Sequence, residues 1–304
     1  MIGNTFQFTW EVKLIQWCQT YIPTSLIKAM EIVSYVGDTV YLVGIMGIAY
    51  LCIDKKFGKR LLINTIIGFM LAAQIKNVFK RRRPYFDNEG IECLKVVDKN
   101  YDVYDIRKQG FSFPSMHSSN IATVTGSIYE YYKKKPYLII AILSSFIVGI
   151  SRFILGCHYP TDVLTGWLLG IICVVVFSKL QDKLSDRNMY IFLLVIGIIG
   201  SLYCESSDFY SGFGITLGFI CADIIDKKYT HFENTKNVLA MILRLLIAVG
   251  AFMIFAEGAK LLIATDIQEA NTFFAYMFRT LRYFIGTFMA LGITPMLYKN
   301  KILK

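Results

Sequence analysis

The stretch YLIIAILSSFIVGISRFILG, residues 137–156, decides the kind of fold that this chain adopts. Its apolar residues form one continuous run, and the run has about the 20 residues that a helix needs to cross the hydrocarbon core of a bilayer. Only helices and closed barrels satisfy their backbone hydrogen bonds inside lipid, and a continuous run favours the helix over alternating strands. The stretch therefore predicts a transmembrane helix.

Similar apolar runs recur along the whole chain. Of its 304 residues, 55% are hydrophobic and 18% are charged, and the mean hydropathy is +0.49. This composition is too apolar for an ordinary soluble domain. We expect an all-α, polytopic membrane helical bundle of about nine transmembrane helices, at residues 25–53, 60–80, 113–132, 137–156, 161–180, 188–204, 208–225, 237–260 and 271–297.

A shorter amphipathic segment, residues 5–22, precedes these runs. Trp10, Trp17 and Tyr21 share one face of a helix there, and Glu11 lies away from that face. The pattern is typical of a helix that lies in the membrane interface. An ordinary packing helix is the alternative interpretation.

The positive charge of the chain indicates membrane orientation. The net charge is +10, which on a soluble protein would suggest a nucleic-acid partner. Here much of the Lys and Arg lies in short loops between apolar runs, so we expect a lipid bilayer around the chain and no nucleic acid. With nine spans, the positive-inside rule places those loops in the cytoplasm. The segment KRRRPYF, residues 80–86, would then lie on the outer side, where its charge needs another reason.

Three polar segments meet at that outer side. The first is KNVFKRRRP, residues 76–84, with Lys76 and Arg83. The second is FPSMHSS, residues 113–119, with Ser115 and His117. The third is SRFILGCHYPTD, residues 151–162, with Arg152, His158 and Asp162. Their residue types predict a site for a tetrahedral oxyanion.

The cations and one helix start supply the anion-binding groups. Lys76, Arg83 and Arg152 form a cationic cradle, because guanidinium forks fit phosphate oxygens and Lys adds a point charge. Ser115 opens a predicted helix, whose first N–H groups and dipole also favour an anion. No acidic cluster is placed to hold a metal, so we expect neither a metal nor a cofactor.

The two histidines supply the reactive groups. His158 would attack phosphorus as nucleophile and form a phosphohistidine. His117 would protonate the leaving oxygen and then help to activate water. Asp162 would hold His158 in the required tautomer.

These segments resemble the three motifs of the phosphatidic acid phosphatase type 2 (PAP2) superfamily. The resembling motifs are Lys76-x6-Arg83-Pro84, Pro114-Ser115-x-His117 and Ser151-Arg152-x5-His158-x3-Asp162. The resemblance covers roughly residues 25–180 and implies a metal-independent phosphohydrolase with His158 as nucleophile. Met116 stands where the family usually has glycine, which affects the expected shape of the pocket more than its chemistry.

The resemblance suggests a division of the chain into three parts. Residues 1–24 would form the interfacial helix, residues 25–204 a membrane phosphatase core built on the family's six helices, and residues 205–304 a three-helix membrane extension.

Each site residue also has a structural interpretation. Lys76 and Arg83 could be anchors that reach from a helix end to the interface. Ser115 could be a plain N-cap. Arg152 and Asp162 could form a structural ion pair. Asp38, within the first predicted span, could approach the pocket.

The sequence therefore predicts a multi-pass phosphatase of the cell membrane with its site on the extracytoplasmic side. The expected substrate is a membrane lipid carrying a phosphate or diphosphate, such as polyprenyl diphosphate or phosphatidic acid. A phosphatase for a soluble ester such as a sugar phosphate, and a non-catalytic lipid-phosphate transporter or binding protein, are the alternatives. Nothing in the sequence specifies an oligomeric state.

Overall fold

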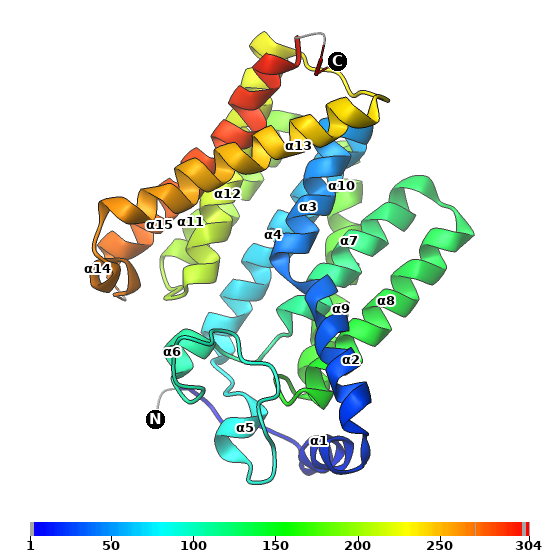
Figure 1. Cartoon of the computed structure of the whole chain (residues 1–304), viewed down its shortest axis with the longest axis vertical. Helices are drawn as coiled ribbons and strands as arrows, with labels where there is room; N and C mark the ends of the chain where they lie inside the picture. The colour runs from blue at the N-terminus through cyan, green and yellow to red at the C-terminus, as the bar shows by residue number, and fades with distance from the viewer. Residues whose placement is uncertain (1–2, 271, 300–301, 304) are drawn as a thin grey trace. The chain divides into compact units, whose positions relative to one another are not determined.

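The computed structural model describes residues 3–270, 272–299 and 302–303 (Figure 1). Apart from one isolated bridge between Asn4 and Arg81, the described elements are helices, which confirms the all-α class. Residues 1–2 of the first predicted part, residues 300–301 and 304 of the third, and residue 271, where the last predicted span begins, lie outside the described residues.

The chain forms two compact units, one of residues 3–43 and 67–179 and one of residues 44–66 and 180–303. The helices that begin in the first unit are α1 (Thr9–Tyr21), α2 (Thr24–Ser34), η1 (Tyr35–Gly37), α3 (Thr39–Ile48), α5 (Pro84–Asp87), α6 (Ile106–Gln109), α7 (Met116–Tyr132), α8 (Lys135–Ile154), α9 (Pro160–Ile172), η3 (Cys173–Phe177) and α10 (Ser178–Lys183). Those that begin in the second are η2 (Ala49–Ile53), α4 (Lys55–Phe79), α11 (Asp186–Ser201), α12 (Ser207–Ile225), η4 (Asp226–Thr230), α13 (Val238–Phe252), η5 (Met253–Glu257), η6 (Gly258–Leu262), α14 (Thr265–Glu269), α15 (Phe273–Phe288), η7 (Met289–Ile293) and η8 (Thr294–Lys299). The division of the chain into residues 1–24, 25–204 and 205–304 stays a prediction.

The helix composition is that of a multi-pass membrane protein, but the prediction of nine spans is wrong. Among the described residues, five helices are long and apolar enough to cross a membrane, at Lys55–Phe79, Lys135–Ile154, Pro160–Lys183, Ser207–Thr230 and Val238–Leu262. A sixth results if the bent pair Thr24–Gly37 and Tyr41–Ile53 counts as one span.

Three predicted spans fail for physical reasons. The helices α7 and α11 have 17 and 16 residues, fewer than the roughly 20 that cross a bilayer. The helix α15 continues directly into η7 and η8, so its length is sufficient, but Arg279 and Arg282 interrupt its apolar sequence. A count of apolar runs in the sequence did not register these short lengths and charges.

In the first unit, α7 and α8 form a hairpin whose turn is basic. Lys133 ends α7 in a left-handed conformation with φ 53°, and α8 begins at Lys135 with a proline in its first turn. The chain then returns through α9, which packs on α7. A Cβ atom on Gly166 would lie 2.5 Å from the carbonyl oxygen of Ser115, so this close approach of α9 to α7 requires glycine. The start of α7, the end of α8 and the start of α9 therefore meet at one end of this unit (Figure 1).

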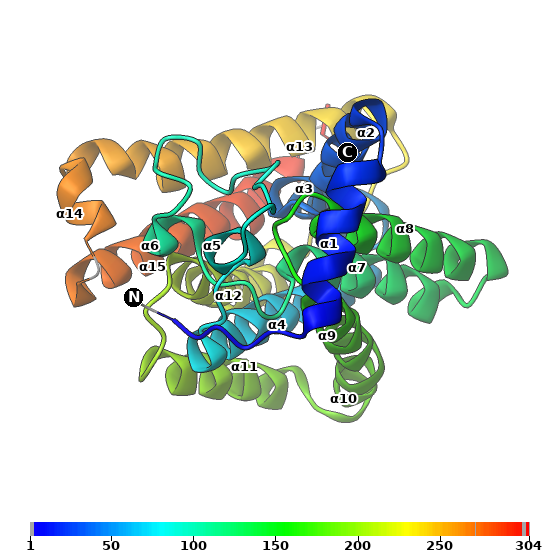
Figure 2. The ribbon, with the colours of Figure 1, turned by 90° about the horizontal axis from the view of Figure 1, so that it is seen from below.

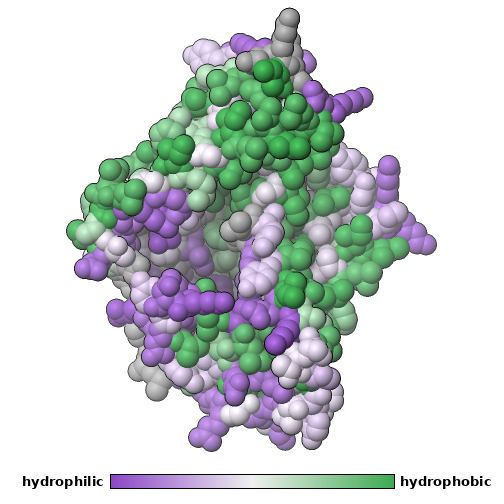
Figure 3. Space-filling model, viewed as in Figure 1, coloured by the Kyte–Doolittle hydropathy of each residue, from purple (hydrophilic) through white to green (hydrophobic). Residues whose placement is uncertain are grey.

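The surface of α8 differs from that of the loop region around α5 and α6. Its exposed side chains include Ile139, Ile142, Leu143 and Phe146, which are 47%, 58%, 52% and 54% exposed. Figure 3 shows hydrophobic surface over α8 and hydrophilic residues around α6. This distribution suits a helix whose outer face contacts lipid.

The helix α1 lies across the end of the unit where the polar segments meet (Figure 2). Its Trp10, Trp17 and Tyr21 are exposed, whereas Glu11 and Ile15 are fully buried. The outward aromatic face fits the amphipathic pattern, and the location of α1 in the membrane interface stays a prediction.

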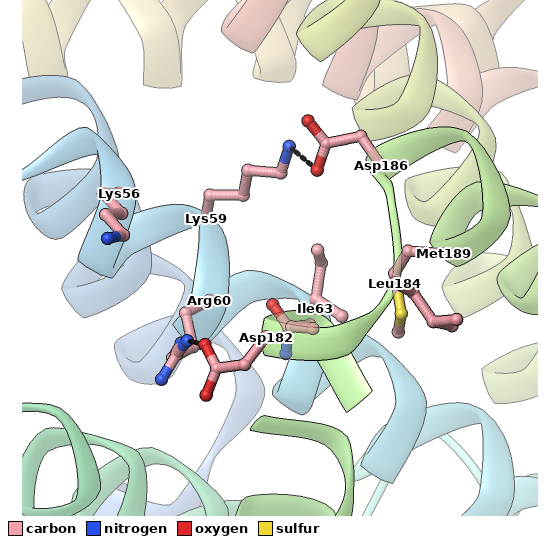
Figure 4. A pocket seen from close by; sticks show the side chains of 9 residues that line it. Lys56, Lys59, Arg60, Ile63, Asp182, Leu184, Asp186 and Met189 are labelled. Atoms are coloured by element: carbon pink, nitrogen blue, oxygen red, sulfur yellow. Dashed lines mark hydrogen bonds and ion pairs between the residues drawn. The ribbon is translucent and has the colours of Figure 1, made fainter. Parts of the chain in front are cut away.

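The second unit contains a cavity of about 250 Å³ between the first turns of α4 and the α10–α11 connection (Figure 4). Two of its three lining cations are paired: Lys59 Nζ lies 2.8 Å from Asp186 Oδ1, and Arg60 forms an ion pair with Asp182. Because these charges neutralise one another, this cavity is a weaker candidate for an anion site than the polar end of the first unit.

Candidate active site

His158 lies in the short loop between α8 and α9. Gly156 lets the chain turn there: its φ is +70°, and a Cβ atom would lie 2.2 Å from the carbonyl oxygen of Glu92. The His158 side chain is buried, and its Nδ1 atom lies 3.5 Å both from Asp162 Oδ2 and from Ser112 Oγ. Burial lowers the pKa of His158 well below its usual value, and the charge of Arg83 lowers it further. The imidazole is therefore held neutral at pH 7.

Lys76 and Arg152 also lower the pKa of His158 through their charges, and His117 lies within the same electrostatic range. All the cations that the sequence predicted around His158 therefore lie within electrostatic range of it, together with the second predicted histidine. The three motifs converge on this loop as predicted.

Asp162 is the carboxylate that the loop is built around. It occupies the third position of α9, after Pro160 at the helix start, and Oδ2 accepts the backbone N–H of Tyr159 at 2.7 Å. Oδ2 also accepts a hydrogen bond from the Ser112 hydroxyl, and Oδ1 lies 2.7 Å from Arg81 Nη1. With its oxygens fixed on several sides, Asp162 holds a defined position next to the His158 ring. The ionic partner of Asp162 is Arg81. The structural alternative had instead expected an ion pair between Asp162 and Arg152.

Sequence reasoning missed Arg81. Its guanidinium is fully buried between Asp162 and Glu11, with Nη2 2.8 Å from Glu11 Oε2, and it stacks over the Tyr159 ring at 3.9 Å. Glu11 also accepts the backbone N–H of Thr161 at 3.0 Å. The unexplained charge of the KRRRPYF segment was the signal that could have found Arg81.

Lys76 and Arg83 fix the segment that precedes α7. Lys76 Nζ donates to the carbonyl oxygen of Phe111 at 2.6 Å. Arg83 Nε donates to that of Gly110 at 3.0 Å, and Nη1 donates to that of Cys157 at 3.0 Å. Arg83 is 6% exposed, unlike a side chain that reaches out to an interface. Arg83 thus ties the segment before the second motif to the His158 loop, and Lys76 anchors the same segment.

Ser115 is the N-cap of α7, as the structural interpretation of it required. Its Oγ accepts the hydroxyl of Ser118 at 2.9 Å and the backbone N–H of Ser118 at 3.4 Å. The backbone N–H of Ser115 donates to the carbonyl oxygen of Asp162 at 2.9 Å. This bond ties the second motif to the third.

His117 and Arg152 line a cavity of about 280 Å³ next to these loops. His117 Nε2 is hydrogen-bonded to the Asp38 carboxylate, which lies in the break between η1 and α3. The expectation that Asp38 approaches the pocket is confirmed. Arg152 donates from Nη1 to the Ser34 hydroxyl. The full lining is Tyr35, Asp38, Lys95, Val96, Val97, Lys99, His117 and Arg152.

This site combines a neutral histidine, a fixed carboxylate and a group of cations. Within the described part of the chain, no group of three or more His, Cys, Asp or Glu side chains is arranged to hold a metal. The arrangement suits nucleophilic attack by an imidazole on a tetrahedral anion.

Comparison with known proteins places the chain in a family. Residues 57–186 match the model of the PAP2 superfamily, and residues 210–304 match that of the "PAP2 superfamily phosphatase, transmembrane extension". The chain belongs to the PAP2 superfamily. The second match explains why helices follow the motif-bearing region.

Curated PAP2 relatives match shorter stretches. Phosphatidylglycerophosphatase B of Bacillus subtilis is 39% identical over 89 residues, which are 26% of this chain and 44% of the relative. Undecaprenyl-diphosphatase of Sulfolobus acidocaldarius is 28% identical over 117 residues, 38% of this chain and 51% of the relative. Lipid A 4'-phosphatase of Bacteroides thetaiotaomicron is 30% identical over 92 residues, 30% of this chain and 41% of the relative. The chain thus spans about half the length of these relatives. No solved structure matches it.

Proposed function

We propose that this PAP2 protein is an integral membrane phosphatase that hydrolyses lipid phosphates or diphosphates through a phosphohistidine, without a metal. The observation that carries the proposal is the buried His158, whose Nδ1 lies 3.5 Å from Asp162 Oδ2. An Nδ1–H donated to that carboxylate leaves the Nε2 lone pair for attack on phosphorus. The names of the three relatives, all lipid phosphatases, support the substrate class.

The reaction takes two displacements. His158 Nε2 forms a bond to phosphorus while the bond from phosphorus to the leaving oxygen breaks, and His117 gives that oxygen a proton. Water then attacks the phosphohistidine, His117 takes up a proton of the water, and the N–P bond breaks to release inorganic phosphate. Arg152, with Lys76 and Arg83, stabilises the charge on the equatorial oxygens. Asp38, bonded to His117 Nε2, orients this proton carrier.

The proposed activity has a direct test. Purified protein in detergent, with EDTA present, should release inorganic phosphate from lipid members of a panel of polyprenyl diphosphate, phosphatidic acid, phosphatidylglycerol phosphate and glucose 6-phosphate. Turnover of the sugar phosphate at the lipid rate would indicate a soluble substrate instead. Tight phosphate binding without release would indicate a transporter or binding protein. Loss of release in EDTA would contradict the metal-independent mechanism.

We also propose that the site faces the extracytoplasmic side. The basic turn at Lys133 and Lys134 lies at the opposite end of α8 from Arg152. The positive-inside rule favours a cytoplasmic location for this turn, which leaves the site outside. The basic segment KRRRPYF would then lie outside, against the positive-inside rule. The buried hydrogen-bond partners of Arg81 and Arg83 explain why these cations are needed there.

A labelling experiment tests the orientation. In intact cells, a membrane-impermeant maleimide should label Lys99→Cys, in the loop that lines the site, and should leave Lys134→Cys unlabelled until the membrane is permeabilised. Both positions are exposed, so folding does not hide either. Labelling in the reverse order would place the site in the cytoplasm.

A further inference from the structure

The cavity beside His117 is lined by several positively charged side chains. In addition to Arg152, its lining includes Lys95 and Lys99 from the loop between α5 and α6. The Asp38 carboxylate in this lining is hydrogen-bonded to His117. This positive charge of the cavity does not include Lys76 and Arg83, which belong to the motifs.

Lys95 is built into the site rather than placed on its surface. The N–H of Leu94 donates to the carbonyl oxygen of Leu155 at 3.0 Å, and the Cys157 thiol donates to the carbonyl oxygen of Lys95 at 3.1 Å. These bonds fix the backbone of Lys95 against the loop that carries His158.

The Lys95 ammonium group is also held in place. It donates to Ser34 Oγ at 3.1 Å, lies 3.8 Å above the Tyr35 ring and is 3.6 Å from Asp38 Oδ2. The side chain is only 10% exposed, and burial lowers the pKa of its amine. An anion bound in the cavity, in addition to the Asp38 carboxylate, would offset the cost of burying the charge of Lys95.

Arg152 points to a ligand independently. The residue is 2% exposed, and its Nε is buried without a hydrogen-bond partner among the described residues. Leaving a buried charged donor unpaired is costly, so a group that the protein does not supply should accept from it. Arg152 and Lys95 share the Ser34 hydroxyl as a partner, which brings the two cations together.

We propose that Lys95 is a specificity-determining residue, which binds the phosphoryl group that is not transferred while Arg152 lies between this group and the transferred one, so that the substrate is a lipid diphosphate. This proposal rests on the proposed function. His158 would attack the terminal phosphorus, and the bridging P–O bond would break with its electron pair on the bridging oxygen. The leaving group is then the lipid monophosphate, which Lys95 and Arg152 neutralise.

The chemistry of the two leaving groups makes the proposal testable. A phosphate monoester has a second pKa near about 6, so it departs as an anion and needs little help from a proton donor. An alcohol departs from a monoester as a far more basic alkoxide, which needs the proton of His117. Lys95 should therefore matter for diphosphates, and His117 should matter more for monoesters.

The experiment compares kcat/KM for a polyprenyl diphosphate and for the matching polyprenyl monophosphate in detergent. Lys95→Met should lower the value for the diphosphate by about 10–100-fold and that for the monophosphate by less than about 3-fold. His117→Ala should reverse this order. Lys134→Met, an exposed Lys-to-Met change at the far end of α8, should alter neither.

Each outcome decides something. Preserved monophosphate turnover shows that Lys95→Met is folded, and Lys95→Arg should keep most of the diphosphate turnover. Equal losses of Lys95→Met on both substrates would overturn the specificity role. A wild-type protein that hydrolyses only the monophosphate would overturn it too. The proposed function would survive either result. Turnover of neither substrate by the wild-type protein would remove the proposed function and the role of Lys95 with it.

Discussion

Replacing His158 by alanine should abolish phosphate release, with a loss of at least about 1,000-fold, because no other group can form the covalent bond to phosphorus. The His158 side chain is 2% exposed. The polar contacts of its ring, from Nδ1 to Asp162 and to Ser112, are both long at 3.5 Å. The backbone bonds that shape the loop, from the N–H groups of Cys157 and His158 to the carbonyl oxygen of Arg152, do not involve the imidazole. The variant should therefore keep its fold. Phosphate release and the elution profile in detergent measure the two effects.

His231→Asn is the matched control. His231 is exposed in the second unit with φ 48°, a left-handed conformation that asparagine tolerates better than alanine. Its phosphate release should equal that of the wild-type protein. Retained turnover in purified His158→Ala would refute the assignment of the nucleophile, and an aggregated variant would call for His158→Gln, which keeps more of the side-chain volume.

The candidate site and the number of spans depend on the sequence in different ways. Residue types and motif spacing selected His158, Asp162 and Ser115, because the elements that carry them are short loops and helix starts whose positions follow from local rules. Ser115 caps α7, and Asp162, at the third position of α9, accepts the backbone N–H of the N-cap residue Tyr159. The number of spans could not be obtained in this way, because the length of a helix depends on where the chain packs and turns.

The buried ion network was not predictable from local patterns. Glu11 lies on the polar side of α1 and was expected away from the apolar face, yet it is fully buried. Its partner Arg81 is 70 residues away in sequence and is one of three adjacent arginines. Arg83 alone among them matches a motif. Only the tertiary structure shows which arginine pairs with which carboxylate.

This network leads to the prediction with the largest effect on stability. Arg81→Met should destabilise the protein by about 3–5 kcal/mol, because it leaves the buried carboxylates of Glu11 and Asp162 without their shared cation. The measurement is the thermal unfolding midpoint in detergent, followed by fluorescence of the tryptophans. Phosphate release should fall as well, because Asp162 loses the contact that fixes its Oδ1.

Arg82→Met is the control beside it in sequence. Arg82 pairs with Asp87 at 2.8 Å, and their side chains are 11% and 15% exposed, so water still reaches both groups. Its loss should be smaller, about 1 kcal/mol, and should leave phosphate release unchanged. Equal destabilisation by the two substitutions would contradict the role of the network.

The double variant Arg81→Met with Glu11→Gln separates charge from packing. If the cost of Arg81→Met comes from unpaired buried carboxylates, removing the charge of Glu11 should restore part of the lost stability, because one of the two carboxylates no longer needs a cation. Phosphate release should stay low, because Asp162 remains without Arg81 next to the His158 ring. If the cost comes instead from the lost stacking of the guanidinium on Tyr159, at 3.9 Å, the second substitution should add to the destabilisation, because Glu11 also holds Thr161. The sign of the change on adding Glu11→Gln therefore decides whether α1 is held to the His158 loop by charge or by packing.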